Sequence, residues 1–101
     1  MTPGYLYIVT NPSHPNFVKV GVTEDIKSRL HVYQTGDPNR KYKMEFYIFH
    51  PDCYKAEKKV RELMKPFAKT IKHEWYEIAL HMAIPRLEEV VEEYSEIPAK
   101  L

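Results

Sequence analysis

Four residues in the first 57 positions have the side chains that hydrolysis of a phosphodiester requires, and they are Tyr7, Lys19, Arg29 and Glu57. Such a reaction needs a base that activates water and cationic groups that stabilise the negative charge of the transition state. A tyrosine beside a cation can supply the base, an arginine fork can hold two phosphate oxygens, and a carboxylate with waters is the usual protein share of a Mg²⁺ site. Taken singly, residues of these types are more often solvated surface groups or ordinary strand residues. Their chemistry therefore depends on the elements that bring them together.

Residues 5–10 and 17–22 predict two antiparallel strands, because both are rich in β-branched and aromatic side chains and six turn-forming residues separate them. One face of this hairpin is aliphatic and is expected in the core, with Leu6, Ile8, Val18, Val20 and Val22. Pairing centred near Ser13 places Tyr7 beside Lys19 on the other face. A neighbouring ammonium favours the phenolate, so we expect Lys19 to lower the pKa of Tyr7 from about 10 toward the range of a useful base.

Arg29 and Glu57 are predicted to lie on two helices, each beside the apolar stripe. Thr23 is the expected N-cap of the first helix, which should end before Gly36. The apolar positions at helical spacing are Ile26, Leu30 and Tyr33 in the first helix, and Ala56, Val60, Leu63, Met64 and Phe67 in the second. Pro66 marks or kinks the end of the second helix. Both charged side chains could then reach over the sheet from the flanks of their helices.

The remaining elements complete the predicted fold. A third strand is expected over 44–49, a short extended segment over 75–78, and a third helix over 80–94 that Pro85 either kinks or begins. The resulting order, β-β-α-β-α-(β)-α, predicts an α+β fold with a small central antiparallel three-stranded sheet flanked by helices.

Length and composition predict one small domain. A chain of 101 residues with 44% hydrophobic residues can build one modest core, and a single cysteine excludes an internal disulfide or a thiolate cluster for zinc. The apolar run at 5–9 is far too short to span a membrane, so we expect a soluble, cytoplasmic protein with no membrane partner. Residues 1–75 carry five excess positive charges, whereas residues 76–101 carry four excess negative charges. A basic body of this kind suits a polyanion, and an acidic tail follows it.

The ordered set of motifs resembles the GIY-YIG nuclease superfamily over residues 4–78. Its pieces are Tyr5-Leu6-Tyr7, then Val18-Lys19-Val20-Gly21, then Arg29 eight residues after that glycine, and Glu57 on the next helix. The likeness is strongest to the phage and viral branch, which has a lysine before the glycine and two further elements, here Thr35-Gly36-Asp37-Pro38 and Glu74-Trp75-Tyr76. The resemblance implies a nuclease-type domain over 1–78, on which an acidic C-terminal helix over 79–101 packs as part of the same domain.

The resemblance further implies a metal-dependent endonuclease that hydrolyses a phosphodiester in DNA by a one-metal mechanism. Tyr7 matches the general base, Lys19 a residue that supports this base, and Arg29 the arginine that steadies the scissile phosphate. Glu57 matches the glutamate that holds the metal, Mg²⁺ or Mn²⁺. Gly21 closes the second motif and is expected to let the backbone turn tightly toward the first helix.

This chain departs from the family pattern at three places. The first motif begins with Tyr5 instead of glycine, Tyr33 replaces a histidine found four residues after the arginine, and a late asparagine near the metal has no match. His31 and His73 could substitute for the asparagine, and together with Tyr33 they are the candidate substrate contacts.

Two alternative interpretations remain open. The fold could have kept a basic groove and lost catalysis, which would leave a nucleic-acid-binding or partner-binding module. The acidic last helix could instead serve as a dimer or partner surface. Because members of this superfamily generally take sequence specificity from an attached DNA-binding domain, a targeting protein partner or a homodimer is also expected.

Overall fold

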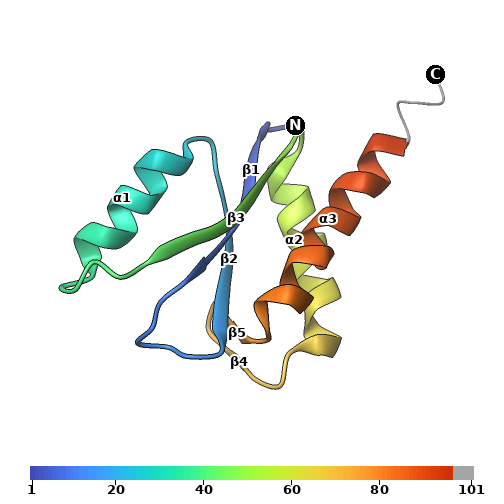
Figure 1. The fold of residues 1–101 in the computed structure, drawn as a ribbon. Helices are drawn as coiled ribbons and strands as arrows, with labels where there is room; N and C mark the ends of the chain where they lie inside the picture. The colour runs from blue at the N-terminus through green and yellow to red at the C-terminus, as the bar shows by residue number, and fades with distance from the viewer. Residues whose placement is uncertain (97–101) are drawn as a thin grey trace.

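The computed structural model describes residues 1–96, with side chains described through residue 93. The part of the expected C-terminal helix at 97–101 lies outside the described residues. The elements in chain order are β1 (Gly4–Thr10), β2 (Phe17–Thr23), α1 (Ile26–Gly36), β3 (Lys43–His50), α2 (Cys53–Met64), a 3₁₀ turn η1 (Lys65–Phe67), β4 (Ile71–Lys72), β5 (Trp75–Glu77) and α3 (Leu80–Glu96) (Figure 1). This order confirms the α+β class.

The strands form one antiparallel sheet in the order β3-β1-β2-β5-β4. The sheet is therefore five-stranded, and the expectation of three strands was wrong. β4 and β5 have two and three residues and are joined by a turn in which His73 has a left-handed φ of 56°. The short extended segment expected over 75–78 is β5, whereas β4 has too few residues for an alternating pattern to show in the sequence. Pairing with β2 stabilises β5, and pairing with β5 stabilises β4.

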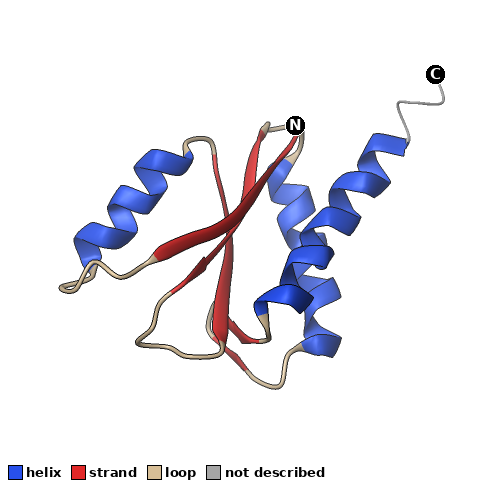
Figure 2. Cartoon of the chain, viewed as in Figure 1, coloured by secondary structure: helices blue, strands red, loops and turns tan. Residues whose placement is uncertain are grey.

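The helices cover the two faces of the sheet unequally (Figures 1 and 2). α2 and α3 pack together against one face and enclose the core, whereas α1 stands apart from them over the other face. The core consists of Leu6, Ile8, Val18, Val20, Ala56, Val60, Met64, Tyr76, Ile78, Ala83, Leu87 and Val90, and Val22 packs against it. The predicted aliphatic face of the hairpin and the apolar stripe of α2 are thus confirmed.

The register of the hairpin differs from the prediction by two residues. Tyr7 lies opposite Gly21, and Lys19 lies opposite Val9, so the pairing is centred on His14. The loop between the strands closes with backbone hydrogen bonds from His14 N–H to the Asn11 carbonyl and from Phe17 N–H to the His14 carbonyl. A shift of two residues leaves every side chain on its face, so Tyr7 and Lys19 become diagonal neighbours instead of direct partners.

The first helix begins later than expected. β2 extends to Thr23, and Asp25 is the N-cap, with its carboxylate accepting hydrogen bonds from the backbone N–H and the hydroxyl of Ser28. The hydroxyl of Thr23 instead accepts a bond from the Asp25 N–H. No residue of α1 is buried, so this helix depends on the bonds at its ends and on a few side-chain contacts with the sheet.

The third helix begins at Leu80, with Pro85 inside it and not in its first turn. Pro66 follows the end of α2 and lies in η1, as its position predicts. Among residues 1–96, no helix combines the length and the apolar character needed to cross a lipid bilayer.

Candidate active site

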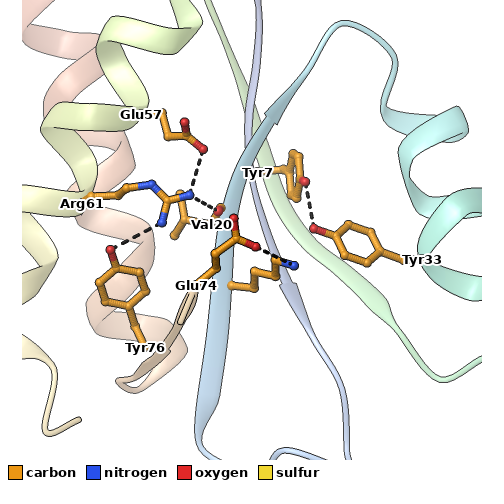
Figure 3. Close-up of polar contacts among 8 residues, drawn as sticks. Tyr7, Val20, Tyr33, Glu57, Arg61, Glu74 and Tyr76 are labelled. Atoms are coloured by element: carbon orange, nitrogen blue, oxygen red, sulfur yellow. Dashed lines mark hydrogen bonds and ion pairs between the residues drawn. The ribbon is translucent and has the colours of Figure 1, made fainter. Parts of the chain in front are cut away.

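Tyr7, Lys19, Arg29 and Glu57 all line one small pocket of about 200 Å³. The pocket lies where β1 and β2 pass between α1 and α2 (Figure 3). Its other lining residues are Val20, Gly21, Val22, Tyr33, Arg61 and Glu74. Four residues chosen from the sequence for their chemistry, and spread over fifty positions, therefore come together in space.

The Tyr7 ring lies directly over Gly21. A Cβ atom added at Gly21 would stand 2.3 Å from the Tyr7 hydroxyl oxygen and 2.5 Å from Cζ, far inside van der Waals contact. No glycine in the described residues has a positive φ. The expectation that Gly21 serves a tight turn was therefore wrong. Its hydrogen side chain leaves the space that the tyrosine ring fills, which follows from the cross-strand pairing of the two residues.

The Tyr7 hydroxyl is hydrogen-bonded to the hydroxyl of Tyr33, with 2.9 Å between the two oxygens (Figure 3). The pKa of Tyr7 is raised well above its ordinary value, because burial disfavours the phenolate and the bond to Tyr33 adds to this effect. Arg29 and Lys19 each lower the pKa of Tyr7, as expected of cations, but by less. The prediction of a net lowered pKa was therefore wrong, since the sequence did not show that Tyr7 is 3% exposed.

Lys19 forms an ion pair with Glu74, with 3.1 Å between Nζ and the carboxylate, and Nζ also lies 5.2 Å over the Tyr33 ring. The bond to Lys19 lowers the pKa of the Glu74 carboxyl. Sequence reasoning used Glu74 only as part of a motif and did not place it in the site. The short pairing of β2 with β5, in which Lys19 lies opposite Trp75, brings it there.

Glu57 is held by Arg61, one turn further along α2. Arg61 Nη2 donates to the Glu57 carboxylate at 3.0 Å and to the Val20 carbonyl at 3.0 Å, while Nη1 lies 3.5 Å from the Tyr76 hydroxyl (Figure 3). The arginine therefore fixes the carboxylate relative to β2. Sequence reasoning missed Arg61, although its i,i+4 spacing from Glu57 is a signal that could have found it.

Two carboxylates line the pocket, and carboxylate oxygens are the donors that hard divalent cations prefer. The Glu57 side chain is 21% exposed and opens into the pocket, and Glu74 adds a second carboxylate at its rim. Among the described residues, no three His, Cys, Asp or Glu side chains gather to hold an ion by themselves. Mg²⁺ and Mn²⁺ are commonly bound through one or two carboxylates, with waters and substrate oxygens completing the shell.

The other residues singled out in the sequence lie around this pocket in different ways. Arg29 is exposed on α1 and lines the pocket mouth. His31 is exposed on α1 and His73 lies in the β4–β5 turn, and neither lines the pocket. The ring of Tyr5 contacts those of Tyr47 and Phe49 on the same sheet face, at centroid distances of 5.8 and 5.7 Å. Of the three candidate substrate contacts, only Tyr33 lines the same pocket as Tyr7, Lys19, Arg29 and Glu57.

Comparisons with known proteins give one match. No curated protein and no solved structure matches the chain. The T5orf172 domain, a phage-associated domain related to nuclease-like domains of the GIY-YIG and HNH types, matches residues 4–96. Because this match covers nearly the whole sequence, the chain belongs to the T5orf172 domain family.

Proposed function

We propose that the protein is a metal-dependent endonuclease that hydrolyses a phosphodiester in DNA. The observation that supports this most is the single pocket shared by Tyr7, Lys19, Arg29 and Glu57. Including Arg61, the lining of this pocket of about 200 Å³ combines two phenols, three cationic side chains and two carboxylates. Membership of a family related to nuclease-like domains agrees with this chemistry.

Tyr7 is the proposed general base that accepts a proton from the attacking water. Because the pKa of Tyr7 is raised, only a small fraction of the phenol is ionised at neutral pH. The positive charges of Lys19 and Arg29 lower the pKa of Tyr7 and so increase the ionised fraction of its phenol. A base with a high pKa is strong once ionised, so the rate should rise with pH.

Arg29 and Lys19 are the proposed phosphate contacts. Arg29 is exposed at the pocket mouth, where its guanidinium can reach two oxygens of a phosphate that arrives from solvent. Lys19 lies deeper, in the sheet, and is already paired with Glu74. Both cations would stabilise the negative charge that develops on the phosphoryl oxygens.

Glu57 is the proposed ligand of Mg²⁺ or Mn²⁺, with Glu74 as the second carboxylate within reach of the pocket. A bound divalent cation would neutralise charge on the scissile phosphate and on the leaving oxygen. Arg61 holds the Glu57 carboxylate through a bond anchored on the Val20 carbonyl, which limits the orientations that the carboxylate can adopt.

Cleavage assays with Glu57→Gln test the proposal. Plasmid DNA and end-labelled single-stranded, double-stranded and branched oligonucleotides would be incubated with Mg²⁺ or Mn²⁺. We expect wild type to cut at least one substrate and Glu57→Gln to lose at least ~10²-fold in rate, because the amide cannot hold the metal as a carboxylate does. Glu62→Gln, on the exposed side of the same helix, is the matched control and should cut like wild type. Equal cleavage by Glu57→Gln and wild type, or no cleavage by wild type of any substrate, contradicts the proposal.

A binding module without catalysis is the second candidate. One contact favours it, because the Arg61 guanidinium already neutralises the Glu57 carboxylate without a metal. This candidate predicts DNA binding that weakens with salt, persists in Glu57→Gln and yields no product at high protein concentration. Binding and cleavage measured on the same oligonucleotides distinguish the two.

A further inference from the structure

A second pocket, of about 390 Å³, lies beside the candidate active site. Its lining residues come from the β1–β2 loop and from the β4–β5 hairpin, and they are Ser13, His14, Pro15, Phe17, Lys72, His73 and Trp75. The volume is within the range of about 300–1,000 Å³ found for small-ligand pockets. None of the residues proposed for phosphodiester hydrolysis lines it.

Trp75 connects the two pockets. On β5 it lies directly opposite Lys19 of β2, and Lys19 Nζ is 6.0 Å from the centre of its ring. The Tyr42 ring stacks beside Trp75 at 6.3 Å with 26° between the planes, and Tyr42 in turn contacts Tyr33, whose hydroxyl bonds Tyr7. A row of aromatic rings therefore runs from the candidate base to the second pocket.

The second pocket joins aromatic surface to positive charge. The ring of His14 lies 5.0 Å from that of Trp75, and both line the pocket. Lys72 and His73 are exposed on the adjoining hairpin, and the described lining residues include no Asp or Glu. The nearest carboxylate along the chain, Glu74, is paired with Lys19. An aromatic ring beside a lysine suits a nucleotide, because the base can stack on the ring and the phosphate can meet the Lys72 ammonium.

We propose that this Trp75 pocket is a subsite for one unpaired nucleotide of the strand that enters the candidate active site. The proposal rests on the proposed function in one respect, that nucleic acid occupies the neighbouring pocket. A base in a duplex is stacked on both sides and cannot lie against Trp75, so the nucleotide held here must be unpaired. The preferred substrate then contains a single-stranded segment beside the bond that is cut.

Intrinsic fluorescence tests the proposal directly, since Trp75 is the sole tryptophan of the chain. The protein would be titrated in EDTA with an oligothymidylate of about eight nucleotides, a length typical of single-stranded binding sites. We expect the emission of Trp75 to be quenched in a saturable manner, and an equal concentration of blunt duplex to quench it much less. EDTA prevents cleavage, so this readout does not depend on nuclease activity.

Binding of a labelled single strand by variants gives the second readout. We expect Trp75→Ala to weaken binding by roughly 5–150-fold and Trp75→Phe to restore most of it, because phenylalanine keeps a stacking surface. Lys72→Ala should weaken binding and reduce its salt dependence, whereas Lys55→Ala, which removes the same charge beside α3, should not. Circular dichroism and thermal melts establish that each variant is folded. If Trp75→Ala does not fold, two measurements still test the subsite. They are the fluorescence titration of wild type and the comparison of strand binding by Lys72→Ala and Lys55→Ala.

The outcomes separate this proposal from the proposed function. Quenching by single strands together with an inactive wild type would leave the subsite standing and reject the nuclease. Cleavage of duplex and single strands at equal rates, with no quenching and unchanged binding by Lys72→Ala, would reject the subsite and leave the nuclease standing.

Discussion

The hydroxyl of Tyr7 is positioned by two residues with different roles. Gly21 provides the space for the ring, and Tyr33 bonds the hydroxyl from the helix on the other side. Both contacts are between residues distant in sequence. The chemistry of the candidate site thus depends on how closely β2 and α1 pack against the Tyr7 side chain.

Gly21→Ala tests the packing at this position. The added Cβ overlaps the buried Tyr7 ring, so the ring must leave its place or β2 must move. We expect a loss of about 1–3 kcal/mol in the free energy of unfolding, measured by urea denaturation, and a loss of DNA cleavage at least as large as that of Tyr7→Phe. Gly36→Ala is the control, because a Cβ at Gly36 meets nothing within 4 Å. A Gly21→Ala protein as stable and active as wild type would show that the ring is not confined.

Tyr33→Phe tests the source of the raised pKa of Tyr7. The hydrogen bond and the charge of Tyr33 both raise this pKa, so their removal should lower it and increase the ionised fraction at a given pH. With Tyr7 as the base, the cleavage rate of wild type should rise about tenfold per pH unit through the alkaline range, and the profile of Tyr33→Phe should lie at lower pH. Initial rates across pH 6–9 and titration of tyrosinate absorbance give the two measurements. A rate independent of pH in both proteins would remove Tyr7 from the role of base.

At the scale of elements, α1 is an unusual helix because it presents Arg29 and Tyr33 to the site without burying any residue. Polar bonds hold both of its ends. Asp25 caps the start, and Asp37 follows the end, where its carboxylate accepts bonds from the Asn11 side chain and from the backbone N–H groups of Asn39 and Lys41. Asp37 therefore ties the helix to the β1–β2 loop.

We expect α1 to loosen at acid pH before the rest of the fold. The pKa values of Asp25 and Asp37 are lowered, chiefly by the bonds they accept from the backbone N–H groups of Ser28 and Lys41. A group whose pKa is lower in the folded state stabilises that state above its unfolded pKa, which is about 3.9, and loses this effect as pH falls through the folded pKa. NMR signals of α1 should therefore broaden or shift below about pH 4, while those of α2 persist.

Asp37→Asn should reproduce part of this loosening at neutral pH, because the neutral amide accepts these bonds more weakly. Asp52→Asn is the matched control, since Asp52 caps α2 without a side-chain hydrogen bond. If α1 and α2 lose their signals together on acidification, α1 is not an independent unit.

At the scale of the whole molecule, α3 completes the core that supports the sheet. Ala83, Leu87 and Val90 lie in the same buried cluster as Val60 and Met64 of α2. Glu57 of the candidate site lies on α2, so its position depends on how α2 packs against α3 and against the sheet.

Leu87→Ala measures this dependence. Leu87 is completely buried, so we expect its truncation to lower the free energy of unfolding by about 2–5 kcal/mol, as measured by urea denaturation. Glu88→Ala, at the next and exposed position, should change it by less than about 0.5 kcal/mol. Equal stability of the two variants would mean that α3 is not part of the cooperative core.

Local periodicity allowed much of this fold to be predicted from the sequence. Alternation in the hairpin identified the core face with Leu6 and Val20, and the helical spacing of Ala56 and Val60 identified the buried stripe of α2. These features are determined locally, because the side-chain direction in a strand or helix repeats with a fixed period. The same periods placed Tyr7 and Lys19 on the sheet face opposite the core and Glu57 beside the apolar stripe of α2.

Only the tertiary structure decided the features that depend on long-range contacts. The register of the hairpin came from the closure of its six-residue loop. β5 pairs with β2, and β4 pairs in turn with β5. The pKa of Tyr7 rises because α1 and β2 bury it, which no local pattern of residues reveals. Contacts with β2 hold Arg61 and Glu74 in the site, since Arg61 donates to the Val20 carbonyl and Glu74 pairs with Lys19. The sequence by itself thus identified four residues, Tyr7, Lys19, Arg29 and Glu57, that line one pocket, and packing between distant segments decided their neighbours and their environment.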